Sequence, residues 1–257
     1  MRYIAVCLAA LAASGLTLFS GFGLGTLLMP VFAVFFPVEV AVAQTAAVHL
    51  ANNLFKLALF GKSTDRPVLL RFGLPAILAS FAGAALLLWL SHLPPVAIYK
   101  LGWRTCTVHP VKLTVAGLML AFSLAELWPG RRELAFDRRW LPAGGVLSGF
   151  FGGLSGHQGA FRSAFLVRAG LSKEAFIGTG VSIACLVDFT RLAAYAKHLS
   201  APGLRASLPL VGAATLAAFL GAFIGSRLVR KITIRSLQAA VAMMLLALSL
   251  LLGAGVI

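Results

Sequence analysis

Recurring apolar runs, separated by short connections, constrain this chain more than any other feature of its sequence. Several of them reach the roughly 20 residues that a helix needs to cross a bilayer. Charged residues make up only 11% of the 257 residues, about half the fraction found in a soluble domain. The pattern therefore predicts an all-α polytopic membrane protein. The runs lie at 4–19, 22–36, 40–60, 68–90, 111–128, 141–166, 175–196, 206–225 and 236–256.

The formal net charge of +15 raises the question of nucleic acid as a partner. The basic residues, however, gather in short connections such as 131–139 and 227–235, as in cytoplasmic loops beside anionic lipid headgroups. We therefore expect the lipid bilayer as a partner and no nucleic acid. The apolar run after Arg2 continues past Gly21, so we expect it to be retained rather than cleaved as a signal peptide.

No pattern in the sequence predicts a metal or a cofactor. The three cysteines, Cys7, Cys106 and Cys185, are far apart and show no metal-ligand spacing. A Walker-type phosphate loop is also missing, so we do not expect this chain to bind ATP. The sequence is compatible with a homo-oligomer.

An internal repeat divides the chain. A half from 1 to 128 aligns with a half from 140 to 257, and the basic connection 129–139 joins them on the expected cytoplasmic side. Repeats in a membrane protein of this size are typical of transporters with a site at the repeat interface; the alternative is a duplication kept for packing alone. At an offset of 135, the alignment places Ser20-Gly21 on Ser155-Gly156, Glu39 on Glu174, Asn53 on Asp188 and Lys56 on Arg191.

Two topologies fit the apolar runs. With four spanning helices in each half, ten Lys and Arg residues face one side and nine face the other. If 3–36 and 140–170 are instead re-entrant hairpins, each followed by about three spanning helices, the split is thirteen to six. The second model obeys the positive-inside rule and makes the repeats inverted, so we favour it. The eight-span model stays open.

Each half contains a glycine-rich stretch that should break a helix. These are GFGLGTLLMP (21–30) and the segment 149–159, which has five glycines between Gly149 and Gly159. A helix broken at membrane depth exposes backbone N–H groups, and these can bind an anion. Polar side chains beside the breaks should face protein or water rather than lipid. In the first half they are His49, Asn52, Asn53 and Lys56, spaced i, i+3, i+4 and i+7 on one helical face.

These residues predict a site for a small oxyanion between the two broken stretches. We expect charge from Lys56, Arg162 and Arg191, and hydrogen bonds from Asn52, Asn53, His157 and Gln158. The surrounding backbone would come from Gly21, Gly23, Gly25, Ser155 and Gly156. Proton-coupling candidates are His49, His157 and Asp188, since histidine titrates near working pH.

Each role has a structural alternative. Asp188 and Arg191 could form an ion pair at i, i+3 that only neutralises itself. Lys56 could extend to the headgroups, and His49 or His157 could be a packed, hydrogen-bonded histidine. Among functions, an anion channel and a scaffold subunit stay open. Gly153-Leu154-Ser155-Gly156 also matches the motif around the nucleophile of rhomboid-type proteases, although a base must lie within reach of that serine.

The segments GFGLGTLLMPVFAVFFPVEVAVAQTAAVHLANNLFK and FGGLSGHQGAFRSAFLVRAGLSKEAFIGTGVSIACLVDFTRL resemble the sulfite exporter TauE/SafE family of membrane permeases. The resemblance covers essentially the whole chain. It implies secondary transport of sulfite, an organosulfonate or a related sulfur-containing or organic anion across the bacterial inner membrane, by a protein that is not an enzyme. Many family members have a proline after the glycine run in both halves. Here His157, Gln158 and Arg162 stand in that place of the second half, which leaves the exact anion open.

Overall fold

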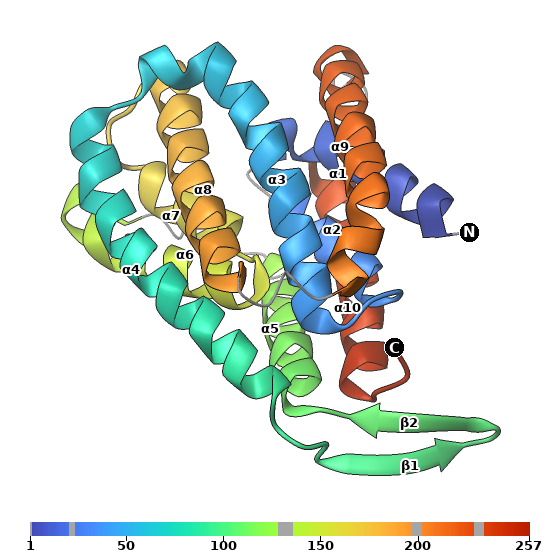
Figure 1. Cartoon of the computed structure of the whole chain (residues 1–257). Helices are drawn as coiled ribbons and strands as arrows, with labels where there is room; N and C mark the ends of the chain where they lie inside the picture. The colour runs from blue at the N-terminus through green and yellow to red at the C-terminus, as the bar shows by residue number, and fades with distance from the viewer. Residues whose placement is uncertain (1, 21–23, 128–135, 197–201, 229–233) are drawn as a thin grey trace.

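The computed structural model describes residues 2–20, 24–127, 136–196, 202–228 and 234–257 (Figure 1). Within these ranges the chain is almost entirely helical, as the apolar runs predict. Two 3-10 turns, Gly61–Ser63 and Arg138–Trp140, precede α4 and α6. The α-helices are α1 (Arg2–Ser20), α2 (Leu24–Ala33), α3 (Val38–Phe60), α4 (Arg66–Ser91), α5 (Pro110–Leu127), α6 (Leu141–Ser155), α7 (Gly159–Leu166), α8 (Lys173–Tyr195), α9 (Pro202–Leu228) and α10 (Ile234–Gly253).

Helices of membrane-spanning character confirm an integral membrane protein. Among the described residues, α4, α8 and the Ser207–Ile224 part of α9 are long and apolar enough to cross a bilayer. Helix α3 has 23 residues and is about 34 Å long at 1.5 Å per residue. It is long enough to cross a bilayer, but it carries polar side chains. Large apolar side chains such as Leu78 and Phe189 lie exposed on the outer surface, where they can contact lipid acyl chains.

Local signals fix where α4 and α8 begin. The Asp65 side chain accepts the Val68 N–H at 2.9 Å at the start of α4, with Pro67 in the first turn. Ser172 caps α8 in the same way, accepting the Ala175 N–H at 3.2 Å. Both are ordinary N-terminal caps, which satisfy backbone donors that have no partner inside the helix.

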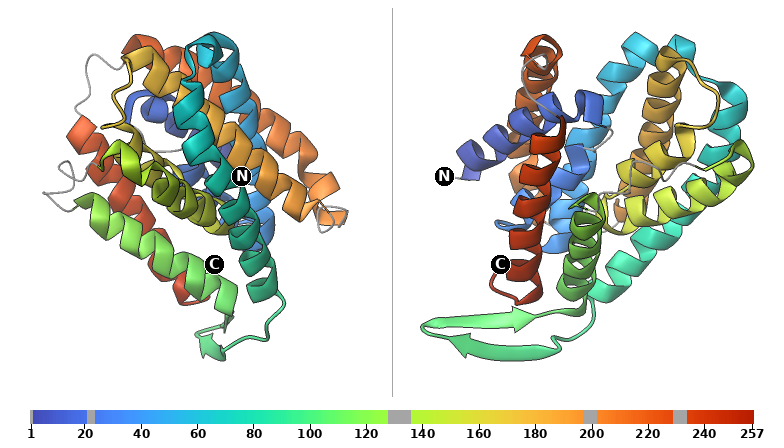
Figure 2. Two further views of the ribbon diagram at one scale, coloured as in Figure 1. Left: turned by 90° about the vertical axis from the view of Figure 1, so that its left-hand side faces the viewer. Right: turned by 180° about the vertical axis from the view of Figure 1, so that it is seen from behind.

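Helices α3 and α8 lie side by side at the centre and run in opposite directions. A Cβ on Gly178, near the start of α8, would lie 2.5 Å from the carbonyl oxygen of Phe60, at the end of α3. Further along, His49 of α3 contacts Asp188 of α8. Around this pair, α4 packs along α6, α1 along α9 and α5 along α10 (Figures 1 and 2). Each of these three pairs joins a helix before residue 128 to one after residue 140.

Glycines allow α6 to approach the backbone of α4 closely. They recur at i, i+4 and i+8, on one face of α6. A Cβ on any of them would lie 2.1 or 2.2 Å from a carbonyl oxygen of α4, closer than any real contact. Small residues at this spacing are typical of helix pairs packed in membranes. The glycines are Gly145, Gly149 and Gly153, and they face Phe72, Ala76 and Ser80 respectively.

The second glycine-rich stretch folds into a helical hairpin. Helix α6 ends at Gly156, whose φ of 83° is left-handed, as is common at a helix C-terminus. The chain then turns back, since Ser148 Oγ donates to the Gln158 carbonyl at 3.0 Å and the Phe165 ring lies beside Gly144. At 15 residues, α6 is about 22 Å long, short of the roughly 30 Å hydrocarbon core. The turn lies within 140–170, where we expect a re-entrant hairpin, and its entry and exit on one side of the membrane stay a prediction.

Most of the first glycine-rich stretch, residues 24–30, lies inside α2, which packs against α1. Gly21 and Gly23 lie outside the described residues, and Gly25 is the second residue of α2.

A two-stranded antiparallel hairpin, β1 (Ala97–Leu101) and β2 (Arg104–Val108), lies across one end of the bundle (Figure 1). Gly102 turns the chain with a φ of 60°, and Tyr99 Oη donates to the Ala254 carbonyl at 2.6 Å. Our sequence prediction contained no strand here. Hydropathy runs of helical length do not detect strands of five residues, although the alternation of polar and apolar residues over 105–108, shortly after Gly102, is a strand signal.

Candidate functional site

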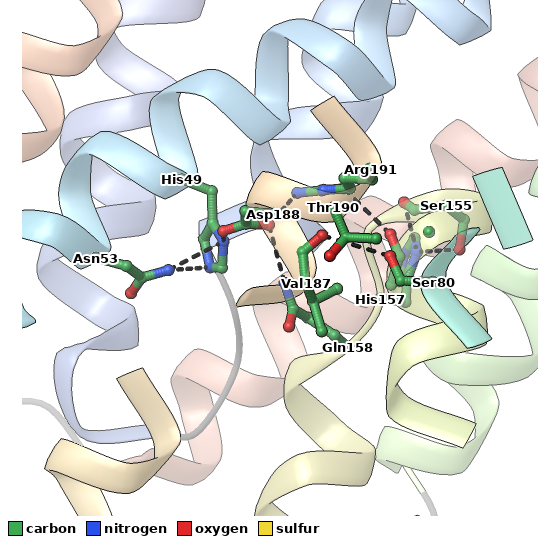
Figure 3. Close-up of polar contacts among 12 residues, drawn as sticks. His49, Asn53, Ser80, Ser155, His157, Gln158, Val187, Asp188, Thr190 and Arg191 are labelled. Carbon is green, nitrogen blue, oxygen red and sulfur yellow. Dashed lines mark hydrogen bonds and ion pairs between the residues drawn. The ribbon is translucent and has the colours of Figure 1, made fainter. Parts of the chain in front are cut away.

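The polar faces of α3 and α8 meet inside the bundle (Figure 3). His49 Nδ1 lies 2.5 Å from Asp188 Oδ2, and Asn53 Nδ2 lies 3.1 Å from the same His49 nitrogen. All three side chains are buried. The i, i+4 spacing of His49 and Asn53 places both on one face of α3, where Asn53 contacts His49 and His49 contacts α8.

Asp188 joins three segments of the chain through its two oxygens. Oδ1 accepts a hydrogen bond from Gln158 Nε2 at 3.0 Å and forms an ion pair with Arg191 Nη2 at 2.7 Å. The carboxylate therefore connects α3, the residue before α7 and α8. The i, i+3 ion pair considered in the sequence analysis is present, but its carboxylate also binds His49 and Gln158. A buried charge is tolerated when its partners are complete in this way.

Arg191 and Tyr195 hold the broken end of α6. Arg191 Nη1 donates to the Gly152 carbonyl at 3.3 Å, and Tyr195 Oη donates to the Gly153 carbonyl at 2.5 Å. The last carbonyls of a helix have no partner inside it and carry its negative dipole end, so a guanidinium stabilises them. A Cβ on Gly156 would lie 2.9 Å from Arg191 Nη1. Sequence analysis missed Tyr195, although it follows Arg191 by four residues on the same face.

Two further cations lie at the other end of this network. Arg162 Nη1 donates to Gln158 Oε1 at 3.3 Å, and Lys56, which is half-buried, is close enough to Arg162 for electrostatic repulsion. In the part of the chain that the structure describes, no carboxylate lies within ion-pair distance of Lys56 or Arg162. The network therefore places three cations around one carboxylate.

Ser155 and His157 lie beside the end of α6. His157 Nδ1 lies 3.1 Å from the Ser155 carbonyl oxygen and 3.0 Å from Ser155 Oγ, and its ring stacks on Phe122 at 5.1 Å. A serine nucleophile needs a base that a third group orients. The other ring nitrogen, Nε2, has no partner among the described residues, and both side chains are buried. The contact between Ser155 and His157 is therefore better explained as packing of the His157 ring than as activation of Ser155 for nucleophilic catalysis.

The two glycine-rich stretches converge near the same place. A Cβ on Gly25 would lie 3.2 Å from the Gly156 carbonyl oxygen and 3.7 Å from Thr45 Cγ2. Asn52 points toward α1, where its Oδ1 accepts a hydrogen bond from Ser14 Oγ at 3.4 Å. The predicted site residues of the two halves are thus gathered in one region, apart from Gly21 and Gly23, for which the structure gives no position.

Several buried polar atoms in this region have no hydrogen-bond partner within the described ranges. Each such atom costs about 1–3 kcal/mol, so a cluster of them indicates a place that a polar ligand could fill. Sequence analysis missed Gln44 and Thr45 because they lie within an apolar run. The atoms are Gln44 Nε2 and Oε1, Thr45 Oγ1, Asn52 Nδ2, His157 Nε2 and Arg191 Nε.

Comparison with known protein families gives one match across nearly the whole chain. The family described as "Sulfite exporter TauE/SafE" matches residues 6–252. Comparisons with curated proteins and with solved structures find no match. The matched range contains every residue of the buried network and both glycine-rich stretches. Metal ligation finds no support in the described residues, where no three His, Cys, Asp or Glu side chains come together.

Proposed function

The chain belongs to the sulfite exporter TauE/SafE family of membrane transporters, and from this premise we propose that it carries a small anion by secondary transport. The anion would be sulfite, an organosulfonate or a related sulfur-containing or organic anion. Its site would lie where the two glycine-rich stretches and the α3–α8 pair meet. The membrane would be the bacterial inner membrane.

The observation that carries this proposal is the excess of positive charge at the network. Arg191 is fully buried, Lys56 and Arg162 are half-buried, and among the described residues Asp188 is the one carboxylate that the network holds. Cations at membrane depth are kept at a cost, and they mark substrate pathways. A bound oxyanion would balance the charge of these cations, and the planar guanidinium group of an arginine can donate two parallel hydrogen bonds to its oxygens.

The arrangement of helices supports an inverted repeat as the basis of transport. Helices α3 and α8 both have 23 residues, start 135 positions apart and run in opposite directions. The α1–α9 and α4–α6 pairs each join the proposed halves, 1–128 and 140–257. A site between inverted halves can be exposed alternately to the two sides when one half rocks against the other.

Proton coupling is a further part of the proposal. Asp188 binds His49 and Arg191 together, so a proton taken up by the carboxylate would release the Arg191 guanidinium for the anion. His157 is a second candidate carrier because its Nε2 is buried and unpartnered among the described atoms. Anion flux that does not change with a pH gradient in proteoliposomes would contradict coupling while leaving anion transport intact.

The test is the thermal stability of the purified protein in detergent against a panel of anions. A ligand present at about 100 times its Kd stabilises the folded state by about 2.7 kcal/mol, about 5–10 °C for a protein of this size. We expect sulfite or a short alkanesulfonate to raise the unfolding temperature of wild type, and chloride at equal ionic strength not to.

Arg162→Gln should lose this response. The matched control is Arg139→Gln, since the Arg139 side chain is 76% exposed and lies outside the network. No shift for wild type with any anion, or an equal shift in Arg162→Gln, would contradict the proposed site.

A further inference from the structure

A cavity of about 420 Å³ lies at the end of the bundle that carries the β-hairpin. The ends of α2, α3, α4 and α5 surround it, and His109 directly follows β2. Its polar lining is Glu39, Ser91, His109 and Lys112. None of these residues belongs to the buried network described above, so the cavity is a separate feature.

One stripe of α3 leads from this cavity to the network. Val38 lines the cavity, and Thr45 and Asn52 follow at intervals of seven residues, which places all three on one helical face. Each interval spans about 10 Å along the helix. Thr45 contacts Gly25 at the meeting point of the glycine-rich stretches, and His49 lies between Thr45 and Asn52 on the same side.

Two polar atoms on this stripe have no hydrogen-bond partner among the described residues. Thr45 Oγ1 and Asn52 Nδ2 are buried and make no hydrogen bond with any described residue. Hydroxyls in helices commonly donate to the carbonyl four residues earlier, and here Thr114 and Thr190 do so at 2.9 and 2.7 Å. Thr45 does not, although it lies inside α3 with such a carbonyl available. Its hydroxyl is thus available to another acceptor.

We propose that the cavity is the entrance for the anion from the β-hairpin face, and that Thr45 and Asn52 hydrogen-bond the anion on its way to Arg191, Arg162 and Lys56. This inference rests on the proposed function and adds a route and two positioning residues to it. Lys112 attracts the anion at the entrance, His109 can donate a hydrogen bond to it, and the Glu39 carboxylate repels it.

Thiol accessibility tests the route without requiring transport. Thr45→Cys is placed in a chain whose Cys7, Cys106 and Cys185 are replaced by serine, in sealed membrane vesicles. A membrane-impermeant methanethiosulfonate reagent with a sulfonate tail is then added from one side. Trp103→Cys, at the hairpin tip where the side chain is 96% exposed, marks the side that the hairpin faces. Ala46→Cys is the matched control, since Ala46 is as buried as Thr45 but, as the next residue of α3, lies about 100° around the helix from the stripe.

We expect the reagent to label Thr45→Cys from the side on which it labels Trp103→Cys, and to leave Ala46→Cys unlabelled. Asn52→Cys is a second reporter on the same stripe if Thr45→Cys does not fold. Labelling only from the opposite side, equal labelling of Ala46→Cys, or no labelling of either reporter in folded protein would overturn the route.

The charges at the entrance give a second readout. In the Thr45→Cys chain, Lys112→Gln should lower the ratio of labelling rates between the sulfonate reagent and its trimethylammonium analogue about fourfold, for a charge about 10 Å away in water. Glu39→Gln should raise that ratio by a similar factor. Ratios unchanged in both variants would overturn the role of the cavity.

The two proposals fail separately. Anion-dependent stabilisation without labelling would support the proposed function and contradict this entrance route. Labelling without stabilisation by any anion would support a water-accessible route and contradict the proposal that an anion is the substrate.

Discussion

Asp188 is the side chain on which the buried network depends. Its two oxygens bind His49, Gln158 and Arg191, and it is fully buried. Removing one partner of a buried ion pair leaves the other charge without compensation and costs about 3–5 kcal/mol. The pairing explains how a charged cluster persists inside an apolar bundle.

Asp188→Asn should therefore destabilise the protein strongly. We expect a loss of about 3–5 kcal/mol, measured by thermal unfolding in detergent, because Arg191 would remain buried without a counter-charge. The control is Asp137→Asn. Asp137 lies 3.7 Å from Arg139, and its side chain is 63% exposed, so its loss should change the unfolding temperature little. Equal unfolding temperatures for the two variants would show that the network does not contribute to stability.

At the scale of elements, the contact between α4 and α6 positions the helical hairpin that carries the site. Gly149 lies at the middle of this contact, and a Cβ there would be 2.1 Å from the Ala76 carbonyl oxygen. Because both sides of the contact are backbone, neither can move away without shifting a helix. Displacing α6 would also displace Gly152 and Gly153, whose carbonyls bind Arg191 and Tyr195.

Gly149→Ala should cost about 1–3 kcal/mol, as overpacking does in a filled core. Gly117→Ala in α5 is the matched control, since a Cβ there meets no atom within 4 Å and alanine is the better helix former by up to about 1 kcal/mol. Thermal unfolding of the two variants compares them directly. A Gly149→Ala protein as stable as Gly117→Ala would contradict the close packing of these helices.

At the scale of the whole molecule, much of the helical architecture could be predicted from the sequence. The apolar runs coincide with helices because burial in lipid demands long apolar segments. The polar face of α3 followed from the spacing of His49 and Asn53. A helix break within 149–159 followed from the density of glycines there, and the structure places it at Gly156, directly after α6.

Other features depend on contacts that no local pattern encodes. His49 and Asp188 are 139 residues apart in the chain, so their pairing requires the packing of α3 on α8. Tyr195 and Thr45 looked like ordinary members of apolar helices until the carbonyl of Gly153 and the backbone of Gly25 were placed beside them. The inverted repeat and the domain limits stay predictions, which the antiparallel α3–α8 pair supports.

The most direct test of anion transport is uptake of labelled sulfite by proteoliposomes as its concentration is raised. We expect uptake that saturates in wild type and in Arg139→Gln, and that falls to the level of empty liposomes in the Lys56→Gln, Arg162→Gln double variant. That result would fit a carrier whose binding site includes Lys56 and Arg162. Uptake that rises linearly without saturation would indicate a channel, and uptake unchanged in the double variant would contradict the site.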